Sequence, residues 1–266
     1  MKRRSFLFNG AFFLAGSIFG LNAFSRAFAF EKLFNKSILR PKVAIIIDDI
    51  GYSLSHARQF LELNVPFTFS ILPRLAKSNA LAIEISSRGH EIMLHQPMEP
   101  YNPKSDPGPG ALYVGYEPDR IVSIIEENIF DVPCAVGVNN HMGSKFTGCN
   151  KETNEALQVV KERGLFFVDS LTSSHSVAYE TAIKLNMASA RRNFFLDNYI
   201  NESAILSQLN KLKKHAQKYG QAIGIGHPFP ETARAIGRFS TSLKDSEISL
   251  VHISKVISTP SDKPFI

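Results

Sequence analysis

The sequence predicts an α/β fold: a seven-stranded (β/α) barrel, or a distorted or incomplete form of a TIM-like barrel. Short apolar runs rich in β-branched residues alternate with segments of helical length, and polar residues follow most of the apolar runs. This alternation predicts a parallel sheet. No internal repeat and no glycine-rich nucleotide motif is present. From the residues alone, a closed barrel and an open doubly wound sheet both fit.

The seven expected strands are the apolar runs. The first, residues 43–47, reads VAIII, and such an uninterrupted β-branched run is typical of a strand buried on both faces. The other six strands are expected at residues 67–71, 91–94, 135–138, 165–168, 187–190 and 222–225.

Helices are expected between these strands. Ser53 is a suitable N-cap for the first helix, and Gly89, Gly164 and Gly220 follow the ends of later helices. The expected helices cover residues 53–63, 75–88, 118–128, 152–163, 176–185 and 201–219, and a last helix precedes the final apolar run 250–257.

The segment 95–116 interrupts this rhythm. It contains five prolines and three glycines, a density at which no regular element is expected. A loop of this length in a compact domain is usually functional or disordered. We expect it to form the rim of a substrate site.

The first 29 residues have the pattern of an export signal. Basic residues 2–4 precede an apolar stretch, and Ala27-Phe28-Ala29 has the small-x-small form of a cleavage site. The run RRSFLF fits both a twin-arginine signal and an ordinary secretory signal with two chance arginines. We expect an exported protein, periplasmic or secreted, with a linker at 30–41, a domain at 42–266 and no stable membrane span after cleavage. An uncleaved anchor is disfavoured, since Asn9, Gly16 and Gly20 weaken the span.

Charge and cysteine content exclude two other classes of site. Without the four basic residues of the signal, 26 of the 30 Lys and Arg residues remain against 24 Asp and Glu residues, so no nucleic-acid partner is expected. The two cysteines, Cys134 and Cys149, do not form a zinc-binding cluster. In an exported protein they form either a disulfide or two free, buried thiols.

Polar and ionisable residues follow six of the expected strands. In parallel α/β folds the carboxyl ends of the strands meet at one rim, where active sites lie. The sequence therefore predicts an active site at that rim. The residues concerned are Asp48 and Asp49, His95, His141, Asp169, Arg191 and Arg192, and His227.

Adjacent carboxylates after an apolar strand repel each other and are costly to bury. One interpretation has one of Asp48 and Asp49 bind a cation while the other acts as a general base. The alternative has one carboxylate cap a helix and the other lie in solvent. His95 and Glu99, four positions apart, suit zinc or a similar cation. His141, in a polar turn, is a further candidate ligand.

The general acid of the reaction is expected directly after the seventh strand. His227 is a natural general acid because its imidazole titrates near neutral pH. Asp169 is a candidate to orient such a group, and Arg192 is a candidate to hold a carboxylate or to polarise the site.

These motifs resemble the divergent polysaccharide deacetylases of the glycoside hydrolase/deacetylase β/α-barrel superfamily. IIIDDIGYS resembles the first motif, which implies Asp48 as general base and Asp49 as metal ligand. GHEIMLHQPMEP resembles the second, with His95 as ligand and Glu99 where a second histidine is usual. NNHMGS occupies the third motif's place without its Arg-x-Pro, and His141 is available as the missing ligand. FFVDS and GIGHP place Asp169 and His227 at the fourth and fifth motifs.

The resemblance implies a metal-dependent hydrolase, with Zn²⁺ as the expected cation, that removes acetyl groups from an envelope glycan or a peptidoglycan-type substrate. The acid and base residues favour an enzyme. The altered second and third motifs favour the alternative, a catalytically silent glycan-binding or envelope scaffold protein. Another metallohydrolase, such as an amidase, is a third possibility.

Overall fold

The structure is a computed structural model that describes residues 40–244 and 246–259. The expected export signal and residues 30–39 of the expected linker lie outside this part. The strands are β1 (Lys42–Ile50), β2 (Thr68–Ile71), β3 (Glu91–Met98), β4 (Ala135–Met142), β5 (Phe166–Asp169), β6 (Ser189–Arg191), β7 (Phe194–Phe195), β8 (Gln221–Gly226) and β9 (Ser249–Val251). The helices are α2 (Leu54–Leu61), α3 (Ser78–Ser87), α4 (Pro118–Asp131), α5 (Asn150–Glu162), α6 (Ala178–Lys184), α7 (Glu202–Tyr219) and α8 (Pro230–Ser242), with 3-10 turns η1 (Phe146–Gly148) and η2 (Ile253–Lys255).

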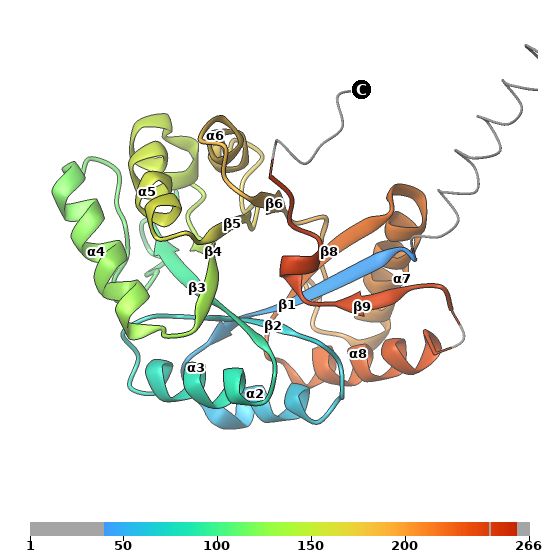
Figure 1. The fold of residues 1–266 in the computed structure, drawn as a ribbon. Coiled ribbons are helices and arrows are strands. Elements are labelled where there is room, and N and C mark those ends of the chain that lie inside the picture. The colour runs from blue at the N-terminus through green and yellow to red at the C-terminus, as the bar shows by residue number, and fades with distance from the viewer. Residues whose placement is uncertain (1–39, 245, 260–266) are drawn as a thin grey trace, which may run out of the picture. The chain divides into compact units, whose positions relative to one another are not determined.

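The strands form one parallel sheet in the order β6-β5-β4-β3-β2-β1-β8-β7, with β9 beside β1 (Figure 1). Ala190 of β6 and Ile225 of β8 belong to one buried cluster although five strands separate them in the sheet, so the sheet curls around a common interior. Within the described residues its end strands β6 and β7 do not pair. The prediction of a distorted or incomplete barrel is therefore confirmed.

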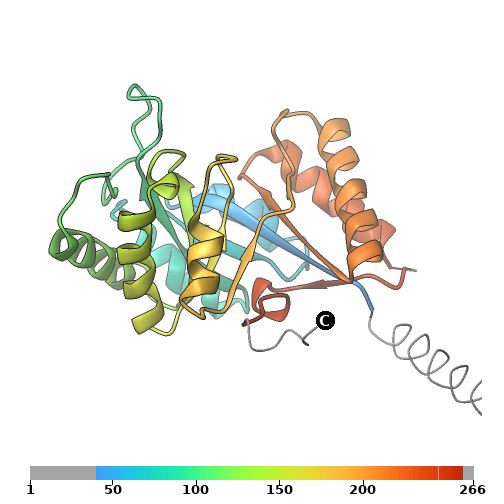
Figure 2. The ribbon, with the colours of Figure 1, turned by 90° about the horizontal axis from the view of Figure 1, so that it is seen from above.

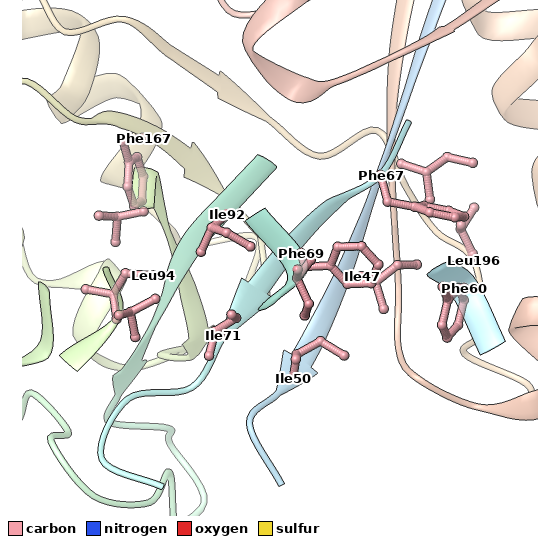
Figure 3. Packing of buried hydrophobic residues seen from close by; sticks show 14 of the residues in the cluster. Ile47, Ile50, Phe60, Phe67, Phe69, Ile71, Ile92, Leu94, Phe167 and Leu196 are labelled. Carbon is pink, nitrogen blue, oxygen red and sulfur yellow. The ribbon is translucent and has the colours of Figure 1, made fainter. Parts of the chain in front are cut away.

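Strand β1 is buried on both faces because its side chains alternate between two apolar clusters. Ala44 and Ile46 face the barrel interior, whereas Ile45 and Ile47 pack under the surrounding helices. Figure 3 shows part of the helix-side cluster, in which Ile47 lies near aromatic side chains of neighbouring elements. This two-sided burial explains the uninterrupted apolar run in the sequence.

Phe67 is central to the helix-side cluster. It is fully buried and its ring lies 5.7 Å from the rings of both Phe60 and Phe69. Phe67→Ala is expected to lower the free energy of unfolding by about 3–5 kcal/mol, since it removes a large buried ring and leaves a cavity. Urea denaturation would measure this loss. Phe130→Ala, at a ring that is 86% exposed, is the control and should change stability by less than about 0.5 kcal/mol; equal effects of the two changes would contradict this view of the core.

Strands β3 and β4 are longer than expected. Both extend four residues past the predicted ends, to Met98 and Met142, so that His95 pairs with Asn139 and Pro97 with His141. The expectation that irregular chain starts at residue 95 is wrong for 95–98. Pro97 is tolerated because β3 no longer pairs with β2 beyond Leu94, so that edge needs no ladder donor at Pro97, whose carbonyl accepts from the amide of Leu112 in the returning loop. Both histidines are thus held by paired strands.

The last described segment closes the amino-terminal end of the barrel. β9 pairs with Lys42, Val43 and Ala44 of β1, and Ser258 bridges to Ser189 at the start of β6. Ile253 and Val256 of this segment are buried in the interior cluster. This segment does not cover the opposite end of the barrel, where the carboxyl ends of the strands lead into loops. No helix in residues 40–244 or 246–259 has both the length and the apolar character needed to cross a bilayer.

Of the two expectations for the cysteines, the structure matches the free thiols but not their burial. Cys134 and Cys149 are both free; the first is exposed and the second half-buried. They lie before and after β4, whose eight residues span about 26 Å at roughly 3.3 Å per residue. A disulfide needs Cα atoms within about 7 Å. The structure accordingly has both thiols free.

Candidate metal and acid–base site

The end of β1 directs two adjacent carboxylates to the same place. Strict strand alternation would send Asp48 and Asp49 to opposite faces. Asp49 instead has a φ of 58°, and the pairing of β1 with β2 is irregular at this point. Asp tolerates this left-handed conformation better than most residues. As a result Asp48 Oδ2 and Asp49 Oδ1 lie 3.6 and 3.2 Å from His95 Nε2.

Three potential ligand atoms converge beside Asp48. Asp49 Oδ1 lies 3.0 Å from His141 Nδ1, and His141 Nδ1 lies 3.2 Å from His95 Nε2. These are the three side chains of the described chain that are grouped closely enough to hold a metal ion. Ligands about 2.0–2.1 Å from a tetrahedral zinc ion are about 3.3 Å apart. The spacing of the three atoms therefore fits a divalent cation.

Asp49 supplies further evidence for a cation. Its Oδ1 atom is buried, yet no described residue gives it a hydrogen bond of good geometry. Burial by itself would raise the pKa of Asp49, but its contacts with His141 and His95 and their charges lower that pKa well below the usual range. A buried, ionised oxygen without a donor is the kind of atom that a cation satisfies.

Asn139 orients this ligand set from behind. Its Oδ1 lies 2.8 Å from His95 Nδ1, and its Nδ2 donates to Asp48 Oδ1 at 2.9 Å. A proton on Nδ1 of His95 leaves Nε2 free to ligate, so a partner of this kind fixes the useful tautomer. The sequence alone gave no role to Asn139. The strand pairing of His95 with Asn139 would have identified it.

His227 is held by Asp197, a residue that sequence analysis did not identify. Its Nδ1 lies 2.9 Å from Asp197 Oδ1, and the other carboxylate oxygen accepts from Thr232 at 2.9 Å. Burial opposes protonation, but the hydrogen bond and charge of Asp197, helped by Asp48 and Asp49, raise the pKa of His227 to about 9. Its Nε2 lies 4.0 Å from Asp49 Oδ2, so this imidazole faces the cation site.

Asp169 does not orient His227, which corrects the sequence prediction. On β5, Phe166 and Val168 face the barrel interior, so strand alternation turns Asp169 toward the helices. Its carboxylate accepts from the backbone amide of Leu171 at 2.7 Å, from the hydroxyl of Ser176 at 2.8 Å and from the amide of Tyr179 at 3.3 Å. Asp169 therefore fastens the β5–α6 loop, and burial raises its pKa.

Arg192 and Glu99 also lie outside the ligand group. Arg192 donates to the carbonyls of Ser170 and Leu171 at 2.7 and 2.8 Å, and its guanidinium stacks 3.6 Å above the ring of Phe195. It supports the wall of the site and forms no ion pair with any described carboxylate. Glu99 binds Lys145 at 2.7 Å and the amide of Val114 at 2.9 Å, so it joins two rim loops.

A cleft of about 340 Å³ gives access to these groups. Asp48, His95, His141 and His227 line it together with Phe195. This volume lies within the usual range for a small-molecule site. A cation site, a buried carboxylate and a protonated imidazole thus face the same solvent-accessible space.

Comparison with known proteins places the chain in a family. Residues 45–257 match the family described as divergent polysaccharide deacetylase. The chain is 32% identical to the uncharacterized protein YibQ of Escherichia coli K12, over 88% of this chain and 73% of the relative. A crystal structure of an uncharacterized protein from Agrobacterium tumefaciens C58 superposes with a TM-score of 0.78 and 25% identity, covering 81% of this chain and 89% of that one.

A more distant neighbour shares the fold alone. The catalytic domain of a peptidoglycan N-acetylglucosamine deacetylase from Eubacterium rectale superposes with a TM-score of 0.53 at 12% identity, covering 84% of this chain and 90% of that one.

Proposed function

The chain belongs to the divergent polysaccharide deacetylase family, and on this basis we propose that it is a divalent-metal-dependent hydrolase that removes acetyl groups from a glycan of the cell envelope. The observation that carries the proposal is the convergence of Asp49, His95 and His141 next to a buried carboxylate and a protonated histidine. A glycan-binding protein has no need of an acid and a base on either side of a cation site.

Asp49, His95 and His141 would hold the cation, and two imidazoles with one carboxylate favour zinc. When bound, the cation supplies Lewis-acid polarisation of the acetyl carbonyl and acidifies a water molecule. Asn139 holds His95 in the ligating tautomer. Asp48, fixed by the Asn139 amide, is placed to accept the proton of the attacking water. His227, protonated through Asp197, is placed to donate a proton to the leaving nitrogen.

Metal analysis combined with an acetate assay tests the proposal. Protein purified without chelator should contain about one divalent cation per chain. It should release acetate from acetylated amino-sugar polymers or peptidoglycan fragments. Metal without acetate release, together with glycan binding that is unchanged by loss of Asp48 and His227, would instead support the silent glycan-binding function.

We further propose that the protein is exported, with residues 1–29 removed. Mass spectrometry of the protein recovered from the envelope fraction should then give Phe30 as the first residue. Replacing Arg3 and Arg4 by lysine should block export if the twin-arginine route is used, and should leave it intact if the signal is an ordinary secretory one.

Loss of the Asp197 carboxylate should change the pH dependence of the reaction. The acid form of His227 is the active one, and the hydrogen bond and charge of Asp197 raise the pKa at which it is lost. Asp197→Asn removes the charge that favours this form while burial still opposes it, so the alkaline limb of the kcat/KM profile should move down by about 1–3 pH units. Asp169→Asn is the matched control, because that buried carboxylate contacts α6 instead of His227. An unmoved limb in Asp197→Asn, or an equal shift in both variants, would refute this role.

A further inference from the structure

The second half of α7 presents a line of lysines to solvent. Lys211, Lys214 and Lys218 are all exposed, and steps of three and four residues place them on one face of the helix. Residues 210–219 contain four lysines and no carboxylate. The positive charge of this face is therefore not neutralised within its own helix.

The stability of α7 does not explain this line. A basic residue in the last turn favours the negative end of the helix dipole, but this accounts for Lys218 alone, because Lys211 lies about two turns before the end of the helix at Tyr219. Lys214 and Lys218 are four residues apart, a spacing at which like charges destabilise a helix. The carboxylate of α7, Glu202, lies at the opposite end of the helix.

Two further lysines lie at the same end of the barrel. Lys42, at the start of β1, donates its backbone amide to the carbonyl of Gly220 directly after α7 at 2.9 Å. Its ammonium lies 3.2 Å from the carbonyl of the exposed Lys255. Figure 2 shows the end of α7 (orange) beside the start of β1 (blue). We use the term basic face for a set of five residues: Lys42, Lys211, Lys214, Lys218 and Lys255.

Nearby carboxylates offset only part of this charge. Glu91 accepts hydrogen bonds from the hydroxyl of Thr68 at 3.3 Å and from the amide of Ser254 at 3.2 Å. Glu247, two residues before β9, is exposed. Neither forms an ion pair with a lysine of the basic face. Five ammonium groups against two carboxylates leave this end of the barrel positively charged.

The arrangement suits an extended anionic surface better than a small anion. Lys211 and Lys218 are about 10 Å apart along the helix axis, so the ammonium groups spread out instead of converging. Tyr219, beside them, is 60% exposed, and the Lys218 ammonium lies 5.0 Å from its ring. Tyrosine is common where a protein meets a membrane surface, because its ring is apolar and its hydroxyl is polar. Clusters of four to eight basic residues are typical of contacts with anionic lipids.

We propose that the basic face binds the surface of a bilayer that contains anionic phospholipids. The contact is peripheral and needs neither the metal nor hydrolysis. The basic face lies at the amino-terminal end of the barrel, whereas the metal cleft lies at the carboxyl ends of the strands. A protein bound in this way holds its cleft away from the lipid, open to polymers outside the membrane.

The test measures sedimentation of residues 30–266 with vesicles. This segment includes every described strand and both apolar clusters, so it keeps the complete core of the barrel. At about 0.05 M NaCl, the protein should bind vesicles of phosphatidylcholine with about 30% phosphatidylglycerol at least tenfold more tightly than vesicles of phosphatidylcholine alone. About 0.5 M NaCl should remove the difference, because the contact is electrostatic.

The triple variant Lys211→Gln, Lys214→Gln, Lys218→Gln should bind the anionic vesicles roughly a hundredfold more weakly, since each lysine near the surface contributes about fivefold. Glutamine keeps the helix propensity of lysine. The matched control removes the same charge elsewhere, at three exposed lysines: Lys77→Gln, Lys151→Gln, Lys161→Gln. The control should bind as the wild type does.

Lysine acetylation followed by mass spectrometry tests the orientation. Anionic vesicles should protect Lys214 and Lys218, whereas Lys104, exposed in the loop after β3, should stay reactive. Protection of Lys104 in their place would overturn the proposed orientation and the basic face with it.

Three other results would overturn the proposal. The first is a wild type that binds neutral and anionic vesicles equally. The second is an equal loss of binding in the triple variant and its control, which would make net charge the cause. The third is lysine-dependent binding of soluble polyphosphate without binding of vesicles, which would make a soluble anionic polymer the partner.

Discussion

Asp49→Ala and His95→Ala proteins are expected to contain no bound cation and to release no acetate. The three ligand atoms come from two strands and the end of a third, and among the described residues they are the group that lies close enough to hold a metal ion. Two remaining ligands rarely retain zinc, for which catalytic sites generally use three protein ligands. Elemental analysis of each variant, purified without chelator, measures the result directly.

Glu99→Gln is the matched control for the metal measurement. The resemblance of the second motif implies a histidine ligand at the position of Glu99, but the Glu99 carboxylate is bound to Lys145 and to the amide of Val114. The variant should retain the cation in full. Metal loss in Glu99→Gln, or full retention in both Asp49→Ala and His95→Ala, would show that the ligand set is wrong.

Asp48→Asn and His227→Ala should each lower kcat by about a hundred- to ten-thousand-fold while the metal and the fold are kept. Asparagine preserves the size of Asp48 and its contact with Asn139, but it cannot take up the proton of the attacking water. Alanine removes the proton donor and leaves the ligand group untouched. Steady-state kinetics, metal content and circular dichroism of the same preparations provide the three readouts.

The pH profile of the wild type provides a second check on this pair. It should be bell-shaped, with apparent pKa values that belong to the coupled site, and its alkaline limb should lie above the ordinary pKa of a histidine because Asp197 raises the pKa of His227. Either variant that keeps its rate within about threefold of the wild type would remove that residue from the proposed acid–base pair.

The seven main strands were predictable because each is a short apolar run between polar segments. In this fold the strands are buried, so their side chains are apolar. Strand β7 was not, because two residues, Phe194 and Phe195, are too few to show a period. Asp197, which follows β7, was missed for the same reason. The sequence also did not show which residues of β5 face the barrel interior. Phe166 and Val168 do, so Asp169 points toward the helices and away from the site.

The candidate ligands were predictable as residue types at strand ends, whereas their grouping depended on backbone detail. Asp49 joins His95 and His141 because its φ is 58°, a value that no sequence pattern specifies. Glu99 fits the spacing of a motif yet turns to Lys145 because the loop after β3 returns beside the loop after β4. The positions of these residues after strands therefore predicted where the site lies, whereas the local backbone geometry decides which of them belong to the ligand group.

The pairing of β1 has a consequence for the order in which the protein assembles during synthesis. One edge of β1 pairs with β8, and the first half of its other edge pairs with β9, so Lys42 is joined to Gln221 and Ser249. A ribosome that has completed only α7 has not yet supplied either partner. Until then β1 exposes an unpaired edge, and contacts between such distant segments form slowly. Nascent chains that stall before Gln221 should consequently be the forms that chaperones bind and proteases remove.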